Sequence, residues 1–269
     1  FTDSSSWTEV LDEREIAELE SALGTAKERG EPLGELSVDD FPLPTLSRRL
    51  EAIVDELEFG RGFSVLRGLP VDKWSVEDAK VIYWGIGLHL GVPVSQNAAG
   101  DLMAHVKDHS EGDLDDPNTV TRAYRTRSAL PFHTDSADIV GLLCLRNAGN
   151  GGVSTLASSM TIYNYLLAHH RELLGIYYRG FVYDRRAEEA TDEVPYYRNA
   201  VYGYFNGQLS CRFYMAQYIE SATARSGIPL SDIERYALRL FQEIGAMDEH
   251  QISMKLQPGD IQLLNNNLV

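Results

Sequence analysis

The sequence predicts an α+β fold in which helices cover an antiparallel β core. Two observations support this class. Apolar residues recur every three to four positions in the first third of the chain, and apolar runs bounded by turn residues dominate the last third. Helical segments followed by hairpins are typical of a β core with its helices on the outside.

Length and composition bound the class of protein. The 269 residues suit one domain, and we expect a helical layer over about residues 1–91 and a β core over about 92–269. The net charge of -16 argues against a nucleic-acid partner, because phosphate binding needs a basic surface. No apolar run approaches the ~20 residues that span a bilayer, so no membrane partner is expected. Two distant cysteines indicate reduced thiols and a cytoplasmic location.

The helical part contains three segments with helical periodicity. They begin near Thr8, Pro44 and Ser75, where Thr8 and Ser75 are the expected N-caps. Residues 62–70 form a short apolar run bounded by turn formers, which predicts a strand.

The last third predicts strands and one further helix. Asn206-Gly207 separates two apolar runs and is a strong hairpin signal. Ser231 opens a capping box for a helix. Two strands, 252–256 and 261–264, flank the turn formers Pro258-Gly259-Asp260.

The chemistry is expected at Pro131-Phe132-His133-Thr134-Asp135. If His133 and Asp135 share an extended strand, both side chains point to one face and can hold one divalent ion. A second histidine from elsewhere would complete the facial triad of non-haem Fe(II) oxygenases. The tripeptide alone is a weak signal, because a histidine beside an apolar strand is more often a hydrogen-bonded core residue. His and Asp also suit zinc.

Three residues are weak candidates for substrate contact. A long polar loop leads into this segment, with acidic residues from Asp108 to Asp116, and a solvated loop is its commoner interpretation. Long loops beside a site often have functional roles, so Gln96 and Tyr124 are candidates, with one of the nearby arginines. Arg212, on a hairpin strand, could pair with a substrate carboxylate, although a surface arginine is at least as common.

Gly151-Gly152 stands before a run of hydroxyl side chains. A phosphate cradle is rejected there, because the lysine and the strand-to-helix unit of a P-loop are absent. The glycines more plausibly form a tight turn, after which a hydroxyl points inward. Ser158 or Ser159 then caps a helix.

The order of these motifs is similar to a known family. Phe-His-Thr-Asp, then Gly-Gly-x-Ser with Ala-Ser-Ser, then Pro-Gly-Asp-Ile and Asn-Asn resembles the taurine dioxygenase (TauD/TfdA-like) family of Fe(II)/2-oxoglutarate-dependent oxygenases. The resemblance implies a double-stranded β-helix, the jelly-roll or cupin-like core, with flanking helices. It implies that His133 and Asp135 ligate iron, and that Ser154, with Thr155 as the less favoured choice, touches 2-oxoglutarate.

The implied reaction is oxidation of a small organic substrate. It uses Fe(II), 2-oxoglutarate and O2, and it releases succinate and CO2. Because Asp135 supplies the carboxylate that halogenating relatives lack, the resemblance favours hydroxylation, desaturation or oxidative cyclisation. It leaves a homo-oligomer open.

One part of the family pattern is missing. The family has a distal His ligand and a 2-oxoglutarate-binding Arg after the Asn-Asn motif, whereas this sequence stops at Val269. His250 precedes the Pro-Gly-Asp turn and lies on the wrong strand. We expect the distal His just beyond Val269, with the C-terminal part of the domain missing here. A catalytically degenerate jelly-roll binding module and a Zn-dependent cupin-like hydrolase are the alternatives.

Overall fold

A computed structural model describes residues 4–97, 99–107 and 129–269, and the chain falls into two compact units. Unit 1 comprises Phe1–Val94, Ala137–Thr155 and Ile252–Asn265. Unit 2 comprises Ser95–Ser136, Leu156–Gln251 and Asn266–Val269. Each unit is described by itself. The predicted single oxygenase domain stays a prediction.

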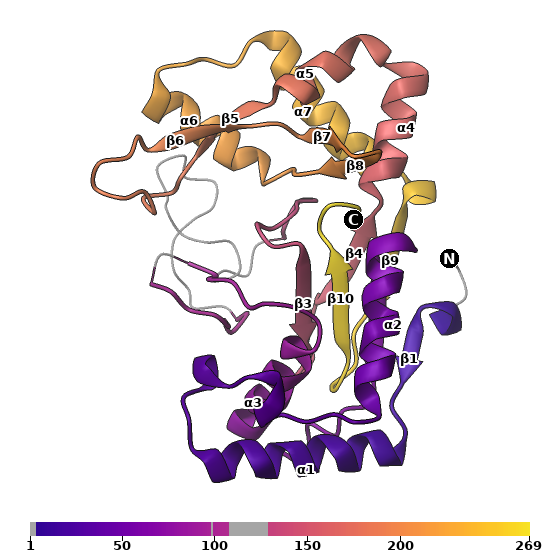
Figure 1. Ribbon diagram of the computed structural model, residues 1–269. Coiled ribbons are helices and arrows are strands. Elements are labelled where there is room, and N and C mark those ends of the chain that lie inside the picture. Colours follow the sequence, from indigo (N-terminus) through magenta and orange to yellow (C-terminus); the bar gives the residue numbers. More distant parts are fainter. Residues whose placement is uncertain (1–3, 98, 108–128) are drawn as a thin grey trace. The chain divides into compact units, whose positions relative to one another are not determined.

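Unit 1 is built from helices and a four-stranded sheet (Figure 1). Its short 3-10 turns are Ser4–Ser6, Leu33–Glu35 and Val38–Asp40. Its longer elements are β1 (Thr8–Val10), α1 (Glu13–Arg29), α2 (Leu46–Phe59), β2 (Phe63–Arg67), α3 (Val76–Leu88), β3 (Ile139–Leu143) and β10 (Ile261–Asn265).

The sheet of unit 1 has the strand order β1-β2-β10-β3. β1 pairs with β2 in parallel, whereas β10 is antiparallel to both β2 and β3. Gln262 therefore has Val65 on one side and Leu142 on the other. β10 supplies the backbone partners that β2 and β3 need, so it is the central strand that holds this sheet together.

The ends of the unit 1 helices follow from their caps. α2 and α3 begin where the sequence predicts, and the hydroxyl of Ser75 accepts from the N–H of Asp78 at 3.0 Å. Thr8 was the wrong cap for α1, since it lies in β1. Asp12 caps that helix by accepting from the N–H of Glu15, whose carboxylate accepts from the N–H of Asp12 in return. The hydrogen bond from Glu15 lowers the pKa of Asp12.

A buried ion pair anchors the start of β10. Asp260 is fully buried and accepts two hydrogen bonds from Arg67, at 2.9 and 2.8 Å, which raise the pKa of Arg67. The preceding Gly259 has φ +89°, and a Cβ there would overlap the carbonyl oxygen of Leu69. The Pro-Gly-Asp turn thus depends on glycine for its backbone and on Asp260 for its charge pairing.

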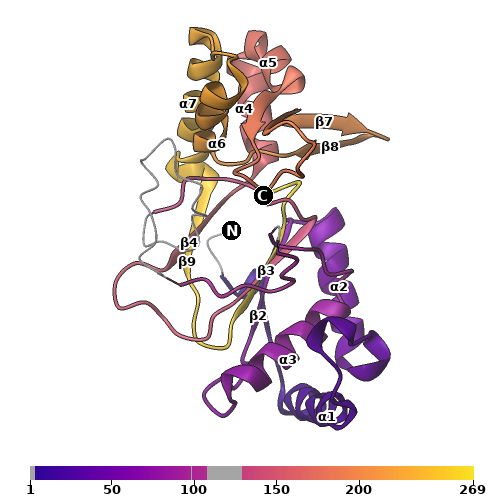
Figure 2. The same cartoon turned by 90° about the vertical axis from the view of Figure 1, so that its left-hand side faces the viewer.

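Unit 2 contains four α-helices among its described residues and two antiparallel strand pairs, β5 with β6 and β7 with β8. Its 3-10 turns are Arg171–Leu173 and Asp248–His250. Its longer elements are α4 (Ser159–His169), α5 (Leu174–Arg179), β5 (Phe181–Asp184), β6 (Tyr196–Asn199), β7 (Tyr202–Phe205), β8 (Gln208–Cys211), α6 (Ala216–Ser226) and α7 (Asp232–Gly245). β4 (Val153–Ala157) and β9 (Gln251–Lys255) form a two-stranded sheet (Figure 2).

Local signals in unit 2 are confirmed. Asn206 and Gly207 join β7 to β8 with φ +48° and +84°, the left-handed conformation that a tight hairpin needs. Ser158 caps α4, and Ser231 forms the predicted capping box with Glu234 at the start of α7.

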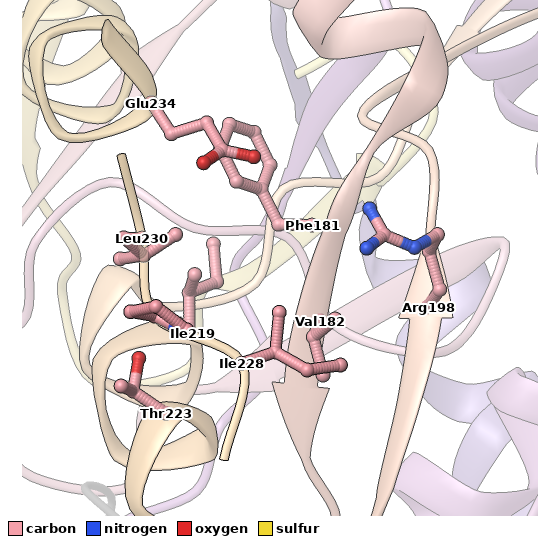
Figure 3. Close-up of a pocket in the computed structure, with 9 residues that line it drawn as sticks. Phe181, Val182, Arg198, Ile219, Thr223, Ile228, Leu230 and Glu234 are labelled. Atoms are coloured by element: carbon pink, nitrogen blue, oxygen red, sulfur yellow. The ribbon is translucent and has the colours of Figure 1, made fainter. Parts of the chain in front are cut away.

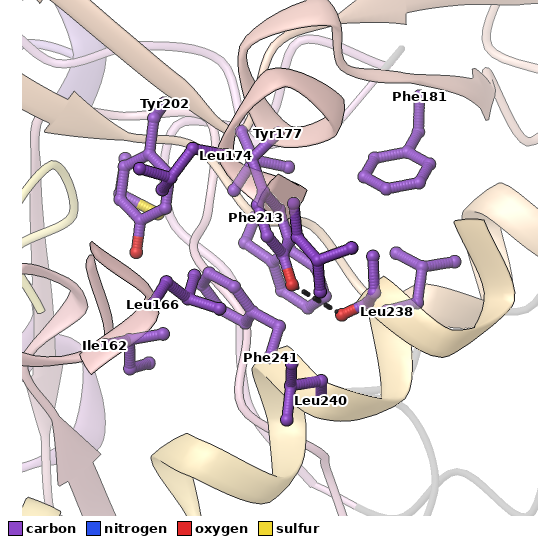
Figure 4. Packing of buried hydrophobic residues seen from close by; sticks show 14 of the residues in the cluster. Ile162, Leu166, Leu174, Tyr177, Phe181, Tyr202, Phe213, Leu238, Leu240 and Phe241 are labelled. Atoms are coloured by element: carbon purple, nitrogen blue, oxygen red, sulfur yellow. Dashed lines mark hydrogen bonds between the residues drawn. The ribbon is translucent and has the colours of Figure 1, made fainter. Parts of the chain in front are cut away.

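The core of unit 2 is rich in aromatic side chains (Figure 4). Phe213 and Phe241 stack with their ring centroids 4.2 Å apart. The buried hydroxyl of Tyr177 donates to the carbonyl oxygen of Ala237 at 2.8 Å. Burial raises the pKa of Cys211 to about 12, so its thiol remains protonated. This core fixes β8 and the residues that follow it.

Candidate metal and cosubstrate site

His133 and Asp135 lie in an irregular segment of unit 2 that ends before β3. The expectation that they share a strand is therefore wrong. The physical reason lies at Thr134, whose N–H donates to the carbonyl oxygen of Phe213 at 2.7 Å. The N–H of Phe213 donates in turn to the hydroxyl of Thr134, at 3.0 Å, and not to a backbone carbonyl. A side chain thus replaces the backbone acceptor that a strand ladder would use.

The peptide groups around the pair are nevertheless fixed. Gln242 donates from its side-chain amide to the carbonyl oxygen of Phe132, at 2.7 Å. The N–H of Asp135 donates to Oδ1 of Asn266, at 3.1 Å. The carbonyl oxygen of Asp135 accepts from Nη1 of Arg212, at 2.9 Å. Three side chains from distant parts of the sequence therefore hold this segment in place of a strand.

The imidazole of His133 is oriented by a backbone carbonyl. Its Nδ1 lies 2.8 Å from the carbonyl oxygen of Pro131. A carbonyl only accepts, so Nδ1 carries the proton, and in the neutral ring Nε2 keeps its lone pair. A hydrogen bond of this kind on the far nitrogen is typical of a metal-ligating histidine.

That lone pair faces a carboxylate. Nε2 of His133 lies 4.0 Å from Oδ1 of Asp135, and the two side chains are 26% and 58% exposed. Two acceptors in this arrangement repel each other unless a cation, either a proton or a metal ion, lies between them. An imidazole and a carboxylate are also the donors that non-haem Fe(II) sites use, so these residues fit the metal. The predicted spacing of the pair brings the two side chains together.

A third ligand is not found beside them. Among residues 4–97, 99–107 and 129–269 there is no group of three or more His, Cys, Asp or Glu side chains that could hold a metal ion. His250 lies just after α7, and its Nδ1 donates to the carbonyl oxygen of Ile244 at 2.8 Å. The distal histidine beyond Val269 stays a prediction.

Ser154 and Thr155 belong to unit 1, on β4, and face opposite sides of that strand. Ser154 donates to Oε1 of the buried Gln262, at 2.9 Å. The hydroxyl of Thr155 lies 3.1 Å from that of Ser253, which is exposed. The two candidate hydroxyls are both partly buried, but one lies beside a buried amide and the other beside an exposed hydroxyl.

The three substrate candidates are placed differently. Gln96 lies on an exposed turn of unit 2, where its N–H donates to the carbonyl oxygen of Asp101 at 2.6 Å. Arg212 contacts Asp135 and is therefore beside the candidate metal ligands. Tyr124 and the acidic loop from Asp108 to Asp116 lie outside the described residues.

A small pocket elsewhere in unit 2 does not form part of this site (Figure 3). Its two charged side chains already form hydrogen bonds within the protein. Arg198 donates to the carbonyl oxygen of Gly180 at 2.9 Å, and Glu234 accepts from the N–H of Ser231 at 2.8 Å. Its remaining lining is mainly apolar and includes Phe181 and Ile219. Both charged side chains that line this pocket are therefore already hydrogen-bonded to other parts of the protein.

Sequence reasoning missed three residues around the site, Gln242, Asn266 and Gln262. Asn266 was noted only as part of the Asn-Asn motif, and Gln262 was not singled out. Asn266 lies 131 residues from Asp135, and Gln262 lies 108 residues from Ser154. No local spacing links such pairs. A glutamine between Ile261 and Leu263 was the one available signal for Gln262.

The fold and the facing His133 and Asp135 define a candidate metal-dependent oxygenase. Comparison with known proteins agrees with that class. Residues 29–269 match the family model of the taurine catabolism dioxygenase TauD, TfdA family. The chain therefore belongs to the TauD/TfdA family. This membership confirms the class predicted from the motifs, a non-haem Fe(II)/2-oxoglutarate-dependent dioxygenase.

Two curated relatives align along the chain. The "FR-33289 synthase" of Streptomyces rubellomurinus is 41% identical over 99% of this chain and 78% of its own length. The "Taurine hydroxylase-like protein SAT17" of Stachybotrys chartarum is 30% identical over 99% of this chain and 69% of its own length.

Solved structures confirm the predicted jelly-roll class of fold. An asparagine oxygenase in complex with Fe(II), 2S,3S-3-hydroxyasparagine and succinate has a TM-score of 0.73 at 18% identity, covering 97% of this chain and 86% of that chain. The oxygenase OrfP in complex with Fe and alpha-ketoglutaric acid has a TM-score of 0.62 at 15% identity, covering 97% and 85%. No helix among the described residues is long and apolar enough to cross a membrane.

Proposed function

We propose that His133 and Asp135 hold the Fe(II) of this dioxygenase and that Ser154 donates a hydrogen bond to a carboxylate of 2-oxoglutarate. Thr155 is the alternative donor. The observation that carries the metal assignment is the pair of facing acceptors, Nε2 of His133 and Oδ1 of Asp135, 4.0 Å apart. The carbonyl of Pro131 fixes the tautomer that directs the Nε2 lone pair to the ion.

Bound Fe(II) and 2-oxoglutarate supply an O2-dependent oxidation coupled to release of succinate and CO2. The protein's own contribution is to position the two candidate ligands. Gln242, Asn266 and Arg212 fix the peptide groups around the two ligands, so that little reorganisation is needed when the ion binds. Asp135 supplies a carboxylate ligand, which supports hydroxylation, desaturation or oxidative cyclisation over halogenation.

The substrate is proposed to be a small organic molecule. Support comes from the relative named as a synthase of FR-33289, with which this chain shares 41% identity. Gln96, Tyr124 and Arg212 remain the predicted substrate contacts. A homo-oligomer and a cytoplasmic location also stay predictions.

The first prediction tests the metal centre. Full-length protein mixed with Fe(II) and 2-oxoglutarate under argon should develop a visible charge-transfer band, because the cosubstrate chelates a metal that both ligands hold. His133→Ala should abolish the band. His169→Ala, which removes an exposed histidine at the end of α4, should keep it.

Succinate release then separates the alternatives. An oxygenase releases succinate only when Fe(II) and O2 are both present. A binding module whose iron site has decayed would show neither the band nor succinate, and a Zn-dependent hydrolase would turn over without O2. A protein fully loaded with Fe(II) that shows no band would contradict the metal assignment.

A further inference from the structure

Gln262 places a polar amide in the interior of unit 1. It lies on β10, whose backbone is paired on both sides, and its side chain is 1% exposed. The amide bridges two residues on other strands. Its Oε1 accepts from the hydroxyl of Ser154 on β4, at 2.9 Å, and its Nε2 donates to Sδ of Met254 on β9, at 3.2 Å.

The thioether of Met254 sets the orientation of that amide. Sulfur is a weak acceptor and cannot donate, so it favours the amide nitrogen on its side. Rotating the amide by half a turn would place Oε1 against Sδ, two acceptors in contact. The oxygen of Gln262 is therefore directed to Ser154, and because an amide oxygen only accepts, the proton of the Ser154 hydroxyl must point to Gln262.

This arrangement has a consequence for cosubstrate binding, which rests on the proposed role of Ser154. A carboxylate of 2-oxoglutarate needs that same proton, since a carboxylate also only accepts. If the hydroxyl turns to the cosubstrate, the buried oxygen of Gln262 loses its partner, which carries a desolvation cost. The two acceptors cannot both receive the one proton.

We propose that Gln262 is a positioning residue that competes with 2-oxoglutarate for the hydroxyl proton of Ser154 and thereby sets cosubstrate affinity. The competition makes binding weaker than the hydroxyl alone would allow. The sulfur of Met254 strengthens the competition by holding the amide in one orientation.

The test is the dissociation constant of 2-oxoglutarate, measured by calorimetry on Fe(II)-loaded full-length protein under argon. Gln262→Met keeps the length of the side chain but removes the amide acceptor, so the dissociation constant should fall by roughly threefold to tenfold. Met254→Leu removes the sulfur that orients the amide, so the nitrogen of Gln262 can turn to Ser154 and release the hydroxyl proton, and the constant should fall here as well, by a smaller factor. A merely structural role would make binding weaker in both variants.

Two further variants complete the design. Ser21→Ala removes an exposed hydroxyl on α1 of the same unit and should leave the constant within about twofold of the parent protein. In a Ser154→Ala background, Gln262→Met should leave the dissociation constant of 2-oxoglutarate unchanged, because the hydroxyl proton for which the two acceptors compete is absent.

The outcomes separate the two proposals. If Ser154→Ala leaves the dissociation constant unchanged, the proposed role of Ser154 is wrong, and that of Gln262 falls with it. If Ser154→Ala weakens binding but Gln262→Met does not tighten it, only the role of Gln262 is overturned.

Discussion

Asp135 is held through its backbone, while its carboxylate stays more than half exposed. Asn266 accepts from its N–H and Arg212 donates to its carbonyl oxygen, so the two ends of one residue are fixed by different parts of the chain. A carboxylate on a fixed backbone can reach a metal ion with only two side-chain torsions to order. The accuracy of this ligand therefore depends on residues that never touch the ion.

A second prediction follows for Asn266. Asn266→Ala should weaken Fe(II) binding by roughly tenfold, in the range found when partners of metal ligands are removed. The reason is that the freed N–H of Asp135 no longer fixes the carboxylate. Titration with Fe(II) under argon measures the effect.

Asn164→Ala is the matched control for this titration, since Asn164 lies on the exposed side of α4. It should bind Fe(II) as the parent protein does. Equal affinities for Asn266→Ala and Asn164→Ala would show that the contact of Asn266 with Asp135 has no part in metal binding.

The two candidate metal ligands could be predicted because they are close together in the sequence. His133 and Asp135 are two residues apart, and this spacing brought them together even though no strand formed. Asn266, Arg212 and Gln262 could not be predicted in their present roles. Their contacts depend on which strands become neighbours, and that is decided by tertiary packing.

Caps decided where the helices begin. Ser75, Ser158 and Ser231 were predictable because a hydroxyl two or three residues before its N–H partner is a local feature. Thr8 was wrong because Asp12 offers a charged acceptor and a reciprocal bond with Glu15, which together outcompete a threonine further upstream.

A third prediction concerns this cap of α1. In the folded protein, the hydrogen bond from the N–H of Glu15 lowers the pKa of the Asp12 carboxyl. The charged carboxylate of Asp12 therefore contributes stability at pH values above its unfolded pKa of about 3.9. That contribution should be lost as the pH falls through the lower, folded value. Urea unfolding at pH 6 and at pH 3 measures the free energy of unfolding.

Asp12→Asn is the informative comparison for the cap. Asparagine keeps the acceptor oxygen but has no charge, so its free energy of unfolding should fall less than that of the parent between these pH values. Other carboxylates titrate equally in both proteins. A parallel decline in the two proteins would mean that the charge of Asp12 adds nothing to the cap.

The sheet of unit 1 depends on one ion pair for the placement of its central strand. Asp260 is fully buried, whereas the Arg67 side chain is 32% exposed. A fourth prediction is that Arg67→Met costs about 2–4 kcal/mol of unfolding free energy, because it leaves a buried carboxylate without its cation. Chemical denaturation monitored by circular dichroism measures this.

The reciprocal change should cost less. Asp260→Asn leaves the guanidinium of Arg67 partly in water, where it is solvated, and retains an oxygen that can accept from the N–H of Gln257. Its loss of stability should therefore be smaller than that of Arg67→Met. The opposite order would show that the buried carboxylate is satisfied without Arg67.

During protein synthesis, β10 is made long after β2 and β3, the two strands that it joins. Arg67 and Asp260 are 193 residues apart, and in the described part of the chain β10, which follows Asp260, is the strand that pairs with both β2 and β3. A nascent chain leaving the ribosome must therefore wait for residues 261–265 with two apolar strand edges unpaired. Such edges are sites of misassociation, and pairings of long sequence separation form slowly. The sheet of unit 1 is therefore completed only after residues 261–265 have been synthesised.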